Sequence, residues 1–295
     1  MSEDGAAPPT PTEAAVPEQT VTFCRADDGV TLATAAVGRG PLLVKTANWL
    51  NHLEHDWQSP IWAPFLRRLA GRFTLVRYDG RGSGLSDRSI SELSQATLER
   101  DLEAVASTLG GERMALLGLS QGVAAAVAFA AHHPERVSRL ILYGGYAQGR
   151  NRRGSPVDAA ASQTMLAMMR QGWGDVDSAF MRAFSSLYLT DASRAYVNSF
   201  AEMQRLSSSG EMAGRLRTAC DDIDVTALLP KVKAPTLVIH ARRDNVSPIA
   251  QARLLAASIP GAQFVTLESE NHIPVPDDPA WPRLMQEIEA FATAG

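Results

Sequence analysis

The sequence has few cysteines and no long apolar run, and both absences narrow the class of protein. Only Cys24 and Cys220 occur among 295 residues, so no disulfide framework is expected and a reduced cytoplasm fits best. No stretch approaches the roughly 18 consecutive apolar residues that a membrane helix needs. The first residues lack the basic and apolar regions of a secretion signal. We therefore expect a cytoplasmic protein without a membrane partner.

The excess of one sign of charge over the other is also small. Lys and Arg number 28 against 32 Asp and Glu, which gives a formal net charge of −4 without a block of like charges. Nucleic acid and anionic membranes attract basic surfaces, so neither is expected as the main partner. The apolar share of 45% and the charged share of 20% are ordinary for a globular protein with one large core. The sequence leaves a homodimer open.

Short apolar runs that suit buried strands alternate with longer helical patterns. The expected strands are residues 21–25, 31–37, 42–44, 73–78, 114–117, 140–143, 236–240 and 264–267. The expected helices include residues 93–109, 121–133, 249–258 and 282–293. Asp27-Asp28-Gly29 between the first two strands is a turn signal that predicts an opening hairpin. Strand and helix in alternation predict a doubly wound, mostly parallel α/β sheet.

One stretch departs from this alternation. Residues 147–224 contain no convincing buried strand and carry Met, Ala, Leu and aromatic residues at helical spacing. We predict an all-helical cap here, inserted between two strands of a core formed by residues 20–146 and 225–295. Residues 1–19 are rich in Ala, Pro, Thr and Glu, and such a composition predicts a disordered tail because it cannot bury a core.

The sharpest motif is Gly118-Leu119-Ser120-Gln121-Gly122, between an expected strand and an Ala-rich helix. Gly-x-Ser-x-Gly in this context is typical of a nucleophile elbow, a strained turn that exposes the serine hydroxyl. Glycines suit the flanking positions because side chains there would collide with the neighbouring strand and helix. The amide of Gln121, at the helix N-terminus, is placed to stabilise an oxyanion. A Gly-rich turn without chemistry is the simpler alternative.

A serine hydroxyl needs a base to take its proton, and His272 is the favoured one of six histidines. It follows the expected strand at 264–267, and active sites of open α/β sheets lie at the carboxyl ends of strands. Asp244 follows the strand at 236–240 and would accept the Nδ1 hydrogen of His272. The chain order Ser, Asp, His is the one expected for this fold. We therefore predict a triad of Ser120, Asp244 and His272.

Other reactive residues have simpler interpretations. An expected linker before Pro230 contains Asp221, Asp222 and Asp224, and the end of the helix at 121–133 contains His132 and His133. The strand at 236–240 contains His240, and the loop after the strand at 42–44 contains His52 and His55. His52 and His55 are close enough in sequence for a metal, but a third ligand is not evident, so neither a metal nor a cofactor is expected. The cluster of Arg150, Arg152 and Arg153 could recognise an anionic substrate, but a solvated edge of the cap is the favoured interpretation.

Together these motifs resemble the α/β-hydrolase family, specifically its smaller capped, esterase-like members. Residues 78–86 look like the loop after the family's fourth strand, and residues 133–137 resemble its link from the elbow helix to the next strand. Residues 48–57 are also similar to hydrolase-like domains that bacteria fuse to cyclase or transcription-regulator modules. The resemblance covers nearly all of residues 20–293.

The resemblance implies a two-step acyl transfer. Where the family often has His-Gly, which supplies the second oxyanion amide, residues 45–49 read Lys-Thr-Ala-Asn-Trp. By position Asn48 supplies this amide, with Trp49 as the alternative. Trp49 and Tyr146, with the Met-rich cap, would line an apolar pocket for a small acyl substrate. The sequence thus predicts a serine esterase that cleaves a small carboxylic ester. The alternatives are lactone, thioester or C–C bond hydrolysis, perhydrolysis, or a ligand receptor with slow or no turnover.

Overall fold

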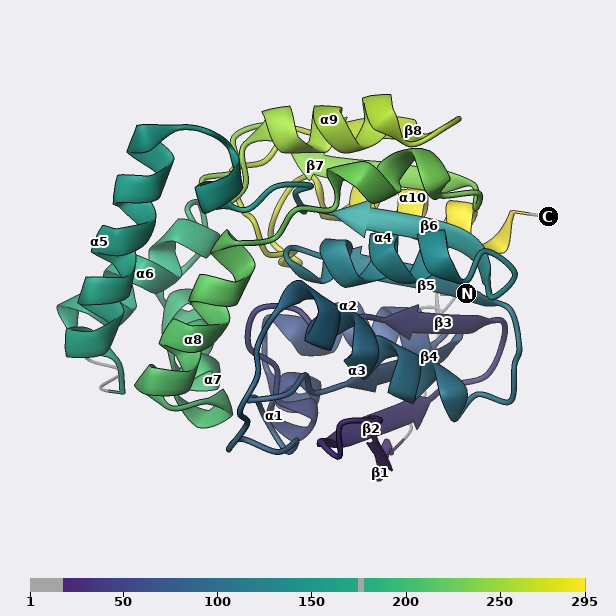
Figure 1. The fold of residues 1–295 in the computed structure, drawn as a ribbon, viewed down its shortest axis with the longest axis horizontal. Helices are drawn as coiled ribbons and strands as arrows, with labels where there is room; N and C mark the ends of the chain where they lie inside the picture. Colours follow the sequence, from purple (N-terminus) through teal and green to yellow (C-terminus); the bar gives the residue numbers. More distant parts are fainter. Residues whose placement is uncertain (1–17, 175–177, 295) are drawn as a thin grey trace, which may run out of the picture.

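The computed structural model describes residues 18–174 and 178–294 (Figure 1). The tail expected over residues 1–19 lies outside these ranges except for its last two residues. The strands are β1 (Thr20–Arg25), β2 (Thr31–Val37), β3 (Leu42–Lys45), β4 (Thr74–Tyr78), β5 (Met114–Leu119), β6 (Val137–Tyr143), β7 (Thr236–Ala241) and β8 (Gln263–Leu267). The helices are α1 (Leu53–Gln58), α2 (Trp62–Ala70), α3 (Gln95–Ser107), α4 (Gly122–His132), α5 (Pro156–Gly172), α6 (Ala179–Tyr188), α7 (Arg194–Ser207), α8 (Gly210–Asp221), α9 (Ile249–Ser258) and α10 (Trp281–Thr293), with 3₁₀ turns η1 (Arg150–Arg152) and η2 (Thr226–Lys231).

The strands of the described residues form one sheet in the order β1-β2-β4-β3-β5-β6-β7-β8. β1 and β2 pair antiparallel as a hairpin, and β2 pairs antiparallel with β4. All later pairings are parallel. The hairpin turns at Gly29, whose φ of 90° lies in the left-handed region that favours glycine. The prediction of a mostly parallel, doubly wound α/β sheet is confirmed.

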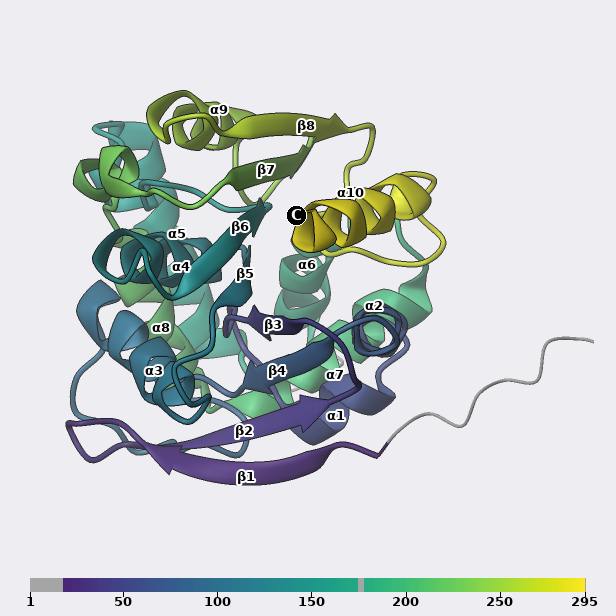
Figure 2. The ribbon, with the colours of Figure 1, turned by 90° about the vertical axis from the view of Figure 1, so that its right-hand side faces the viewer.

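Helices cover both faces of the sheet. α3, α4 and α9 lie on one face, and α1, α2 and α10 lie on the other (Figure 2). Neighbouring strand residues therefore enter separate apolar clusters, with Leu43 and Leu117 in one and Val44 and Leu116 in the other. This double coverage is why the parallel strands are near-continuous apolar runs in the sequence. Within the described ranges, none of the helices is both long and apolar enough to cross a membrane.

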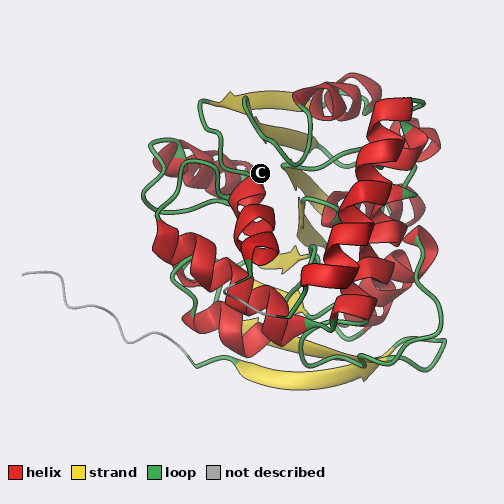
Figure 3. Cartoon of the chain, turned by 90° about the vertical axis from the view of Figure 1, so that its left-hand side faces the viewer, coloured by secondary structure: helices red, strands yellow, loops and turns green. Residues whose placement is uncertain are grey.

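Helices α5 to α8 occupy the chain between β6 and β7, and we call residues 147–224 the helical insertion. It lies beside the arrowheads of β3 and β6, at the carboxyl ends of the strands (Figure 1). Seen from that side, helices stand in front of the strands (Figure 3). The two ends of the insertion meet, since Gln148 and Asp224 form an isolated antiparallel bridge. The insertion thus leaves and rejoins the core at one point.

The sequence predicts a loop at His52 and His55, whereas the structure has the short helix α1 here. His52 is the N-cap of α1, and its Nδ1 accepts a hydrogen bond from the His55 amide at 3.4 Å. α1 has only six residues, too few for a helical period to be recognised in the sequence. Across the described chain, no group of three or more His, Cys, Asp or Glu side chains is placed to hold a metal ion.

Candidate active site

Ser120 lies in the sharp turn between β5 and α4. Its φ is 52°, and it is the one non-glycine residue within 18–174 and 178–294 that has a positive φ. Such a conformation costs about 1–3 kcal/mol and persists only where the surroundings hold it. The Ser120 amide donates to the Tyr143 carbonyl at 2.9 Å, which fixes the turn against the end of β6. This is the geometry that the Gly-x-Ser-x-Gly motif predicts.

Two glycines allow this turn to pack closely. A Cβ added at Gly118 would lie 2.9 Å from Val123 Cα in α4. A Cβ added at Gly122 would lie 2.4 Å from both the Ala47 carbonyl oxygen and Thr46 Oγ1. Side chains do not tolerate such distances, so glycine at position 118 lets β5 pack against α4, and glycine at position 122 lets the elbow lie against the loop after β3.

His272 lies in the loop after β8, and its ring joins Ser120 to Asp244. Nε2 is 2.9 Å from Ser120 Oγ, and Nδ1 is 2.6 Å from Asp244 Oδ2. The His272 side chain is 4% exposed and that of Asp244 is fully buried. With the proton on Nδ1 donated to the carboxylate, Nε2 keeps a lone pair that accepts the serine hydroxyl hydrogen. Three residues far apart in the chain therefore form one hydrogen-bonded series.

The surroundings of Asp244 keep it ionised. Its Oδ1 accepts from the amides of Val246 at 2.7 Å and Ser247 at 3.0 Å. Burial raises the pKa of Asp244, but the charge and hydrogen bond of His272 outweigh burial, and the pKa lies below its ordinary value. The nearby His240 donates Nε2–H to the Ser247 carbonyl at 2.9 Å, and burial lowers its pKa. His240 is thus a neutral strand residue, as the sequence suggested.

The loop that carries His272 is fastened to the helical insertion. The amides of His272 and Ile273 both donate to the Tyr188 carbonyl at the end of α6, at 2.9 and 3.2 Å. The Tyr188 ring packs edge-on against the imidazole, with ring centroids 5.5 Å apart. Asn271 Oδ1 also accepts from the Asp191 amide at 3.0 Å. Sequence reasoning missed Tyr188 because a carbonyl acceptor leaves no signal in the sequence.

Backbone amides near Ser120 differ in whether they already have an acceptor. In the described part of the chain, neither the Gln121 amide nor the Trp49 amide has one. The Asn48 amide, expected from the sequence as the second oxyanion donor, instead donates to Asn51 Oδ1 at 2.9 Å. Both residues line a cavity with Ser120, so the difference between them is that the Trp49 amide is free to donate whereas the Asn48 amide is not.

Two small cavities meet at Ser120. The first is mostly apolar and includes the rings of Trp62 and Phe200, whereas the second includes Tyr146 and three arginines. Trp49 and Tyr188 line both cavities. The two expected pocket residues, Trp49 and Tyr146, therefore both line a cavity that contains Ser120. The cavities measure about 10 and 30 Å³, room for about one water each. A substrate therefore needs the surrounding side chains or helices to move apart.

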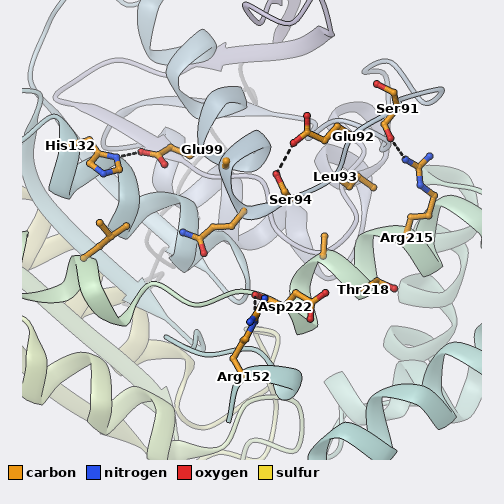
Figure 4. Close-up of a pocket in the computed structure, with 14 residues that line it drawn as sticks. Ser91, Glu92, Leu93, Ser94, Glu99, His132, Arg152, Arg215, Thr218 and Asp222 are labelled. Carbon is orange, nitrogen blue, oxygen red and sulfur yellow. Dashed lines mark hydrogen bonds and ion pairs between the residues drawn. The ribbon is translucent and has the colours of Figure 1, made fainter. Parts of the chain in front are cut away.

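A much larger cleft, of about 750 Å³, lies between the start of α3, the end of α4 and α8. Figure 4 shows its polar walls, where His132 pairs with Glu99 at 2.6 Å and Arg215 donates to the Ser91 carbonyl at 2.6 Å. No member of the serine, histidine and aspartate series lines it. We therefore place the candidate active site at the two smaller cavities, because these contain Ser120 and the larger cleft does not.

The rival carboxylates make other contacts. Asp221 Oδ2 accepts from Arg217 Nε at 2.9 Å. Asp222 Oδ1 accepts from Asn151 Nδ2 at 2.9 Å, and Asp224 Oδ1 accepts from the amide two residues later. Asp244 is the carboxylate that contacts the imidazole.

Comparison with known proteins places this geometry in a family. The family model described as "alpha/beta hydrolase fold" matches residues 55–279. A 2-hydroxy-6-oxononadienedioate/2-hydroxy-6-oxononatrienedioate hydrolase from Paraburkholderia phymatum is 30% identical over 218 residues, covering 69% of this chain and 73% of that one. A pyrrolizixenacetamide deacetylase from Xenorhabdus hominickii is 26% identical over 253 residues, covering 82% and 88%. The crystal structure of a hydrolase from Pseudomonas aeruginosa PA01 is 27% identical, with a TM-score of 0.76 over 93% of this chain and 98% of that one. The chain therefore belongs to the α/β-hydrolase fold family.

Proposed function

We propose that this protein is a serine hydrolase that cleaves small carboxylic esters, with Ser120 as nucleophile, His272 as base and Asp244 as the acid that orients it. The observation that carries the proposal is the hydrogen-bonded series from Asp244 through His272 to Ser120, ending at a strained elbow. A protein that only binds a ligand has no need of an activated serine.

The first step is acylation. Ser120 Oγ attacks the ester carbonyl carbon while its proton passes to His272 Nε2. The amides of Gln121 and Trp49 donate to the developing oxyanion, and Trp49 replaces Asn48 in this role because the Asn48 amide is already bonded. The C–O bond then breaks, and the leaving alcohol takes the proton from His272. The serine is left as an acyl ester.

The second step is hydrolysis. Water gives a proton to His272 while its oxygen attacks the acyl carbon. The bond between that carbon and Ser120 Oγ then breaks, His272 returns the proton to Oγ, and the carboxylic acid is released. We further propose that residues 147–224 act as a cap on a core of residues 20–146 and 225–295. The contribution of Tyr188 and Phe200 to the apolar cavity supports this role. The reaction as proposed uses no cofactor.

Related reactions could use the same nucleophile. The names of the Xenorhabdus and Paraburkholderia relatives describe a deacetylase and a hydrolase of a dienedioate. Lactones, thioesters, C–C bonds and perhydrolysis therefore remain alternatives to esters, since one fold and one triad host many reactions. A panel of nitrophenyl esters of rising chain length, run beside lactones and thioesters, ranks them by kcat/KM.

A serine-reactive fluorophosphonate tests the proposal directly. The adduct should map to Ser120 by peptide mass spectrometry, because only an activated hydroxyl reacts quickly. Ser120→Ala should lose the adduct and about three or more decades of ester hydrolysis, as removal of a triad member does. Ser107→Ala, on an exposed face of α3, is the matched control and should retain both.

Ester hydrolysis that persists in Ser120→Ala would overturn the proposal. Labelling of Ser120 without steady-state turnover of any ester, lactone or thioester would instead favour the receptor alternative.

A further inference from the structure

The arginines of the sequence cluster at residues 150–153 divide between two cavities. Arg150 and Arg153 line the cavity that contains Ser120. Arg152 lines the large cleft, where its Nε donates to the Asp222 carbonyl at 3.1 Å (Figure 4). The three side chains therefore differ in environment: Arg150 and Arg153 are half-buried beside the serine cavity, whereas Arg152 is exposed.

A third guanidinium joins the first two from a distant part of the chain. Arg217, in α8, lines the same cavity and is only 6% exposed. Its Nε is 2.9 Å from Asp221 Oδ2. Arg150 reaches the same carboxylate at 4.0 Å, and its side chain is 17% exposed. One buried carboxylate thus faces two guanidinium groups.

Arg153 makes no such ion pair. Its Nε donates to the Gln148 carbonyl at 3.0 Å, and its guanidinium lies 5.8 Å from the centre of the Tyr146 ring. In the part of the chain that the structure describes, no carboxylate lies within ion-pair distance of it. Among the described residues, Asp221 is the one acidic side chain that lines this cavity, so three arginines and one aspartate leave an excess of two positive charges beside the nucleophile.

Such an excess of charge in a confined space favours an anion. Partly buried charges are costly unless they are paired, and an incoming anion offsets that cost. The planar guanidinium donates two parallel N–H bonds that match a carboxylate. The opposite side of Ser120 is apolar, with Trp62 and Phe200. The serine therefore lies between a cationic and an apolar cavity.

We propose that the cavity of Arg150, Arg153 and Arg217 binds a carboxylate carried by the substrate of Ser120. The preferred substrates are then esters with a second, free carboxyl group, such as half-esters of dicarboxylic acids, whose uncharged end occupies the apolar cavity. This assignment rests on the proposed hydrolase function and names the substrate class of that site.

The test uses two fluorophosphonates that differ only at the far end of the alkyl chain, where one carries a carboxylate and the other its methyl ester. The rate of adduct formation at Ser120 is measured for each at low ionic strength. The carboxylate probe should react about tenfold or more faster, the effect of one charged hydrogen-bonded pair. In Arg150→Gln and Arg153→Gln the ratio of the two rates should fall toward one.

Arg152→Gln is the matched control, because this neighbour faces the other cleft; its rate ratio should equal that of the wild type. Equal or faster reaction of the methyl ester probe with wild-type protein would overturn the carboxylate site and leave the hydrolase function standing. A ratio that falls equally in all three variants would also overturn it, since general surface charge would explain the preference. Failure of both probes to react would overturn the proposed function itself.

Discussion

Replacing Asp244 by asparagine tests whether the tautomer of the imidazole controls the reaction. Oδ1 of Asp244 accepts the amides of Val246 and Ser247 at 2.7 and 3.0 Å, whereas Oδ2 accepts Nδ1–H of His272 at 2.6 Å. An asparagine preserves the two amide bonds only if its carbonyl oxygen takes the Oδ1 position. Its NH₂ group then faces Nδ1, so the imidazole must carry its proton on Nε2.

The size of the effect follows from these contacts. The opposite orientation would point NH₂ at two buried amides and leave them unsatisfied, at about 1–3 kcal/mol each. A total of at least about 2 kcal/mol favours the first orientation by a factor of about 30 or more. A proton on Nε2 then faces Ser120 Oγ across 2.9 Å, and the ring cannot accept the hydroxyl hydrogen. The same change in a serine protease triad lowers kcat by about four decades, and we expect a similar loss here.

Steady-state hydrolysis of a nitrophenyl ester measures kcat and KM of the variant, and a thermal melt checks its fold. The melting temperature should change little, because asparagine has the shape of aspartate. Asp222→Asn, at an exposed rival carboxylate, should keep kcat within about twofold, as surface substitutions do. An Asp244→Asn protein with kcat within about tenfold of the wild type would refute the tautomer argument.

Two further predictions follow from the side-chain contacts of loops. Asn51→Ala removes the acceptor of the Asn48 amide and loosens the segment that carries the Trp49 amide. We expect kcat to fall by about tenfold with KM nearly unchanged, a smaller effect than the loss of a whole oxyanion donor. A change in KM alone would contradict this expectation. The hydrogen bond from Arg81 holds the pKa of Asp28 at about 2, below its ordinary value of 3.8. The carboxylate therefore stabilises the fold above pH 3.8 and loses that contribution as the pH falls through about 2. Asp28→Asn should flatten the fall in melting temperature over that range, and an unchanged slope would count against the reasoning.

The sheet was predictable because its strands are covered on both faces. β7 begins at Thr236 and β8 ends at Leu267, both as expected. β6 begins at Val137, whereas the sequence predicts a start at residue 140. The prediction starts late because the half-buried Ser138 and Arg139 interrupt the apolar run, although the strand pairs with β5 there. Apolar runs in the sequence mark the buried part of a strand, so polar residues at strand ends are not predicted.

Parts of the site could not be predicted, for a different reason. Which of the Asn48 and Trp49 amides is free depends on where the Asn51 side chain lies, and no pattern of residue types records that. The directions of Arg150 and Arg153 depend on the η1 turn and on the approach of α8. Ser120 was easier to identify because its conformation demands glycines in fixed positions.

The carbonyl of Tyr188 accepts the amides of both His272 and Ile273, so the loop that carries the imidazole is attached to the end of α6. An outward movement of α6 would break these two hydrogen bonds, and the imidazole would then be held by its contacts with Asp244 and Ser120.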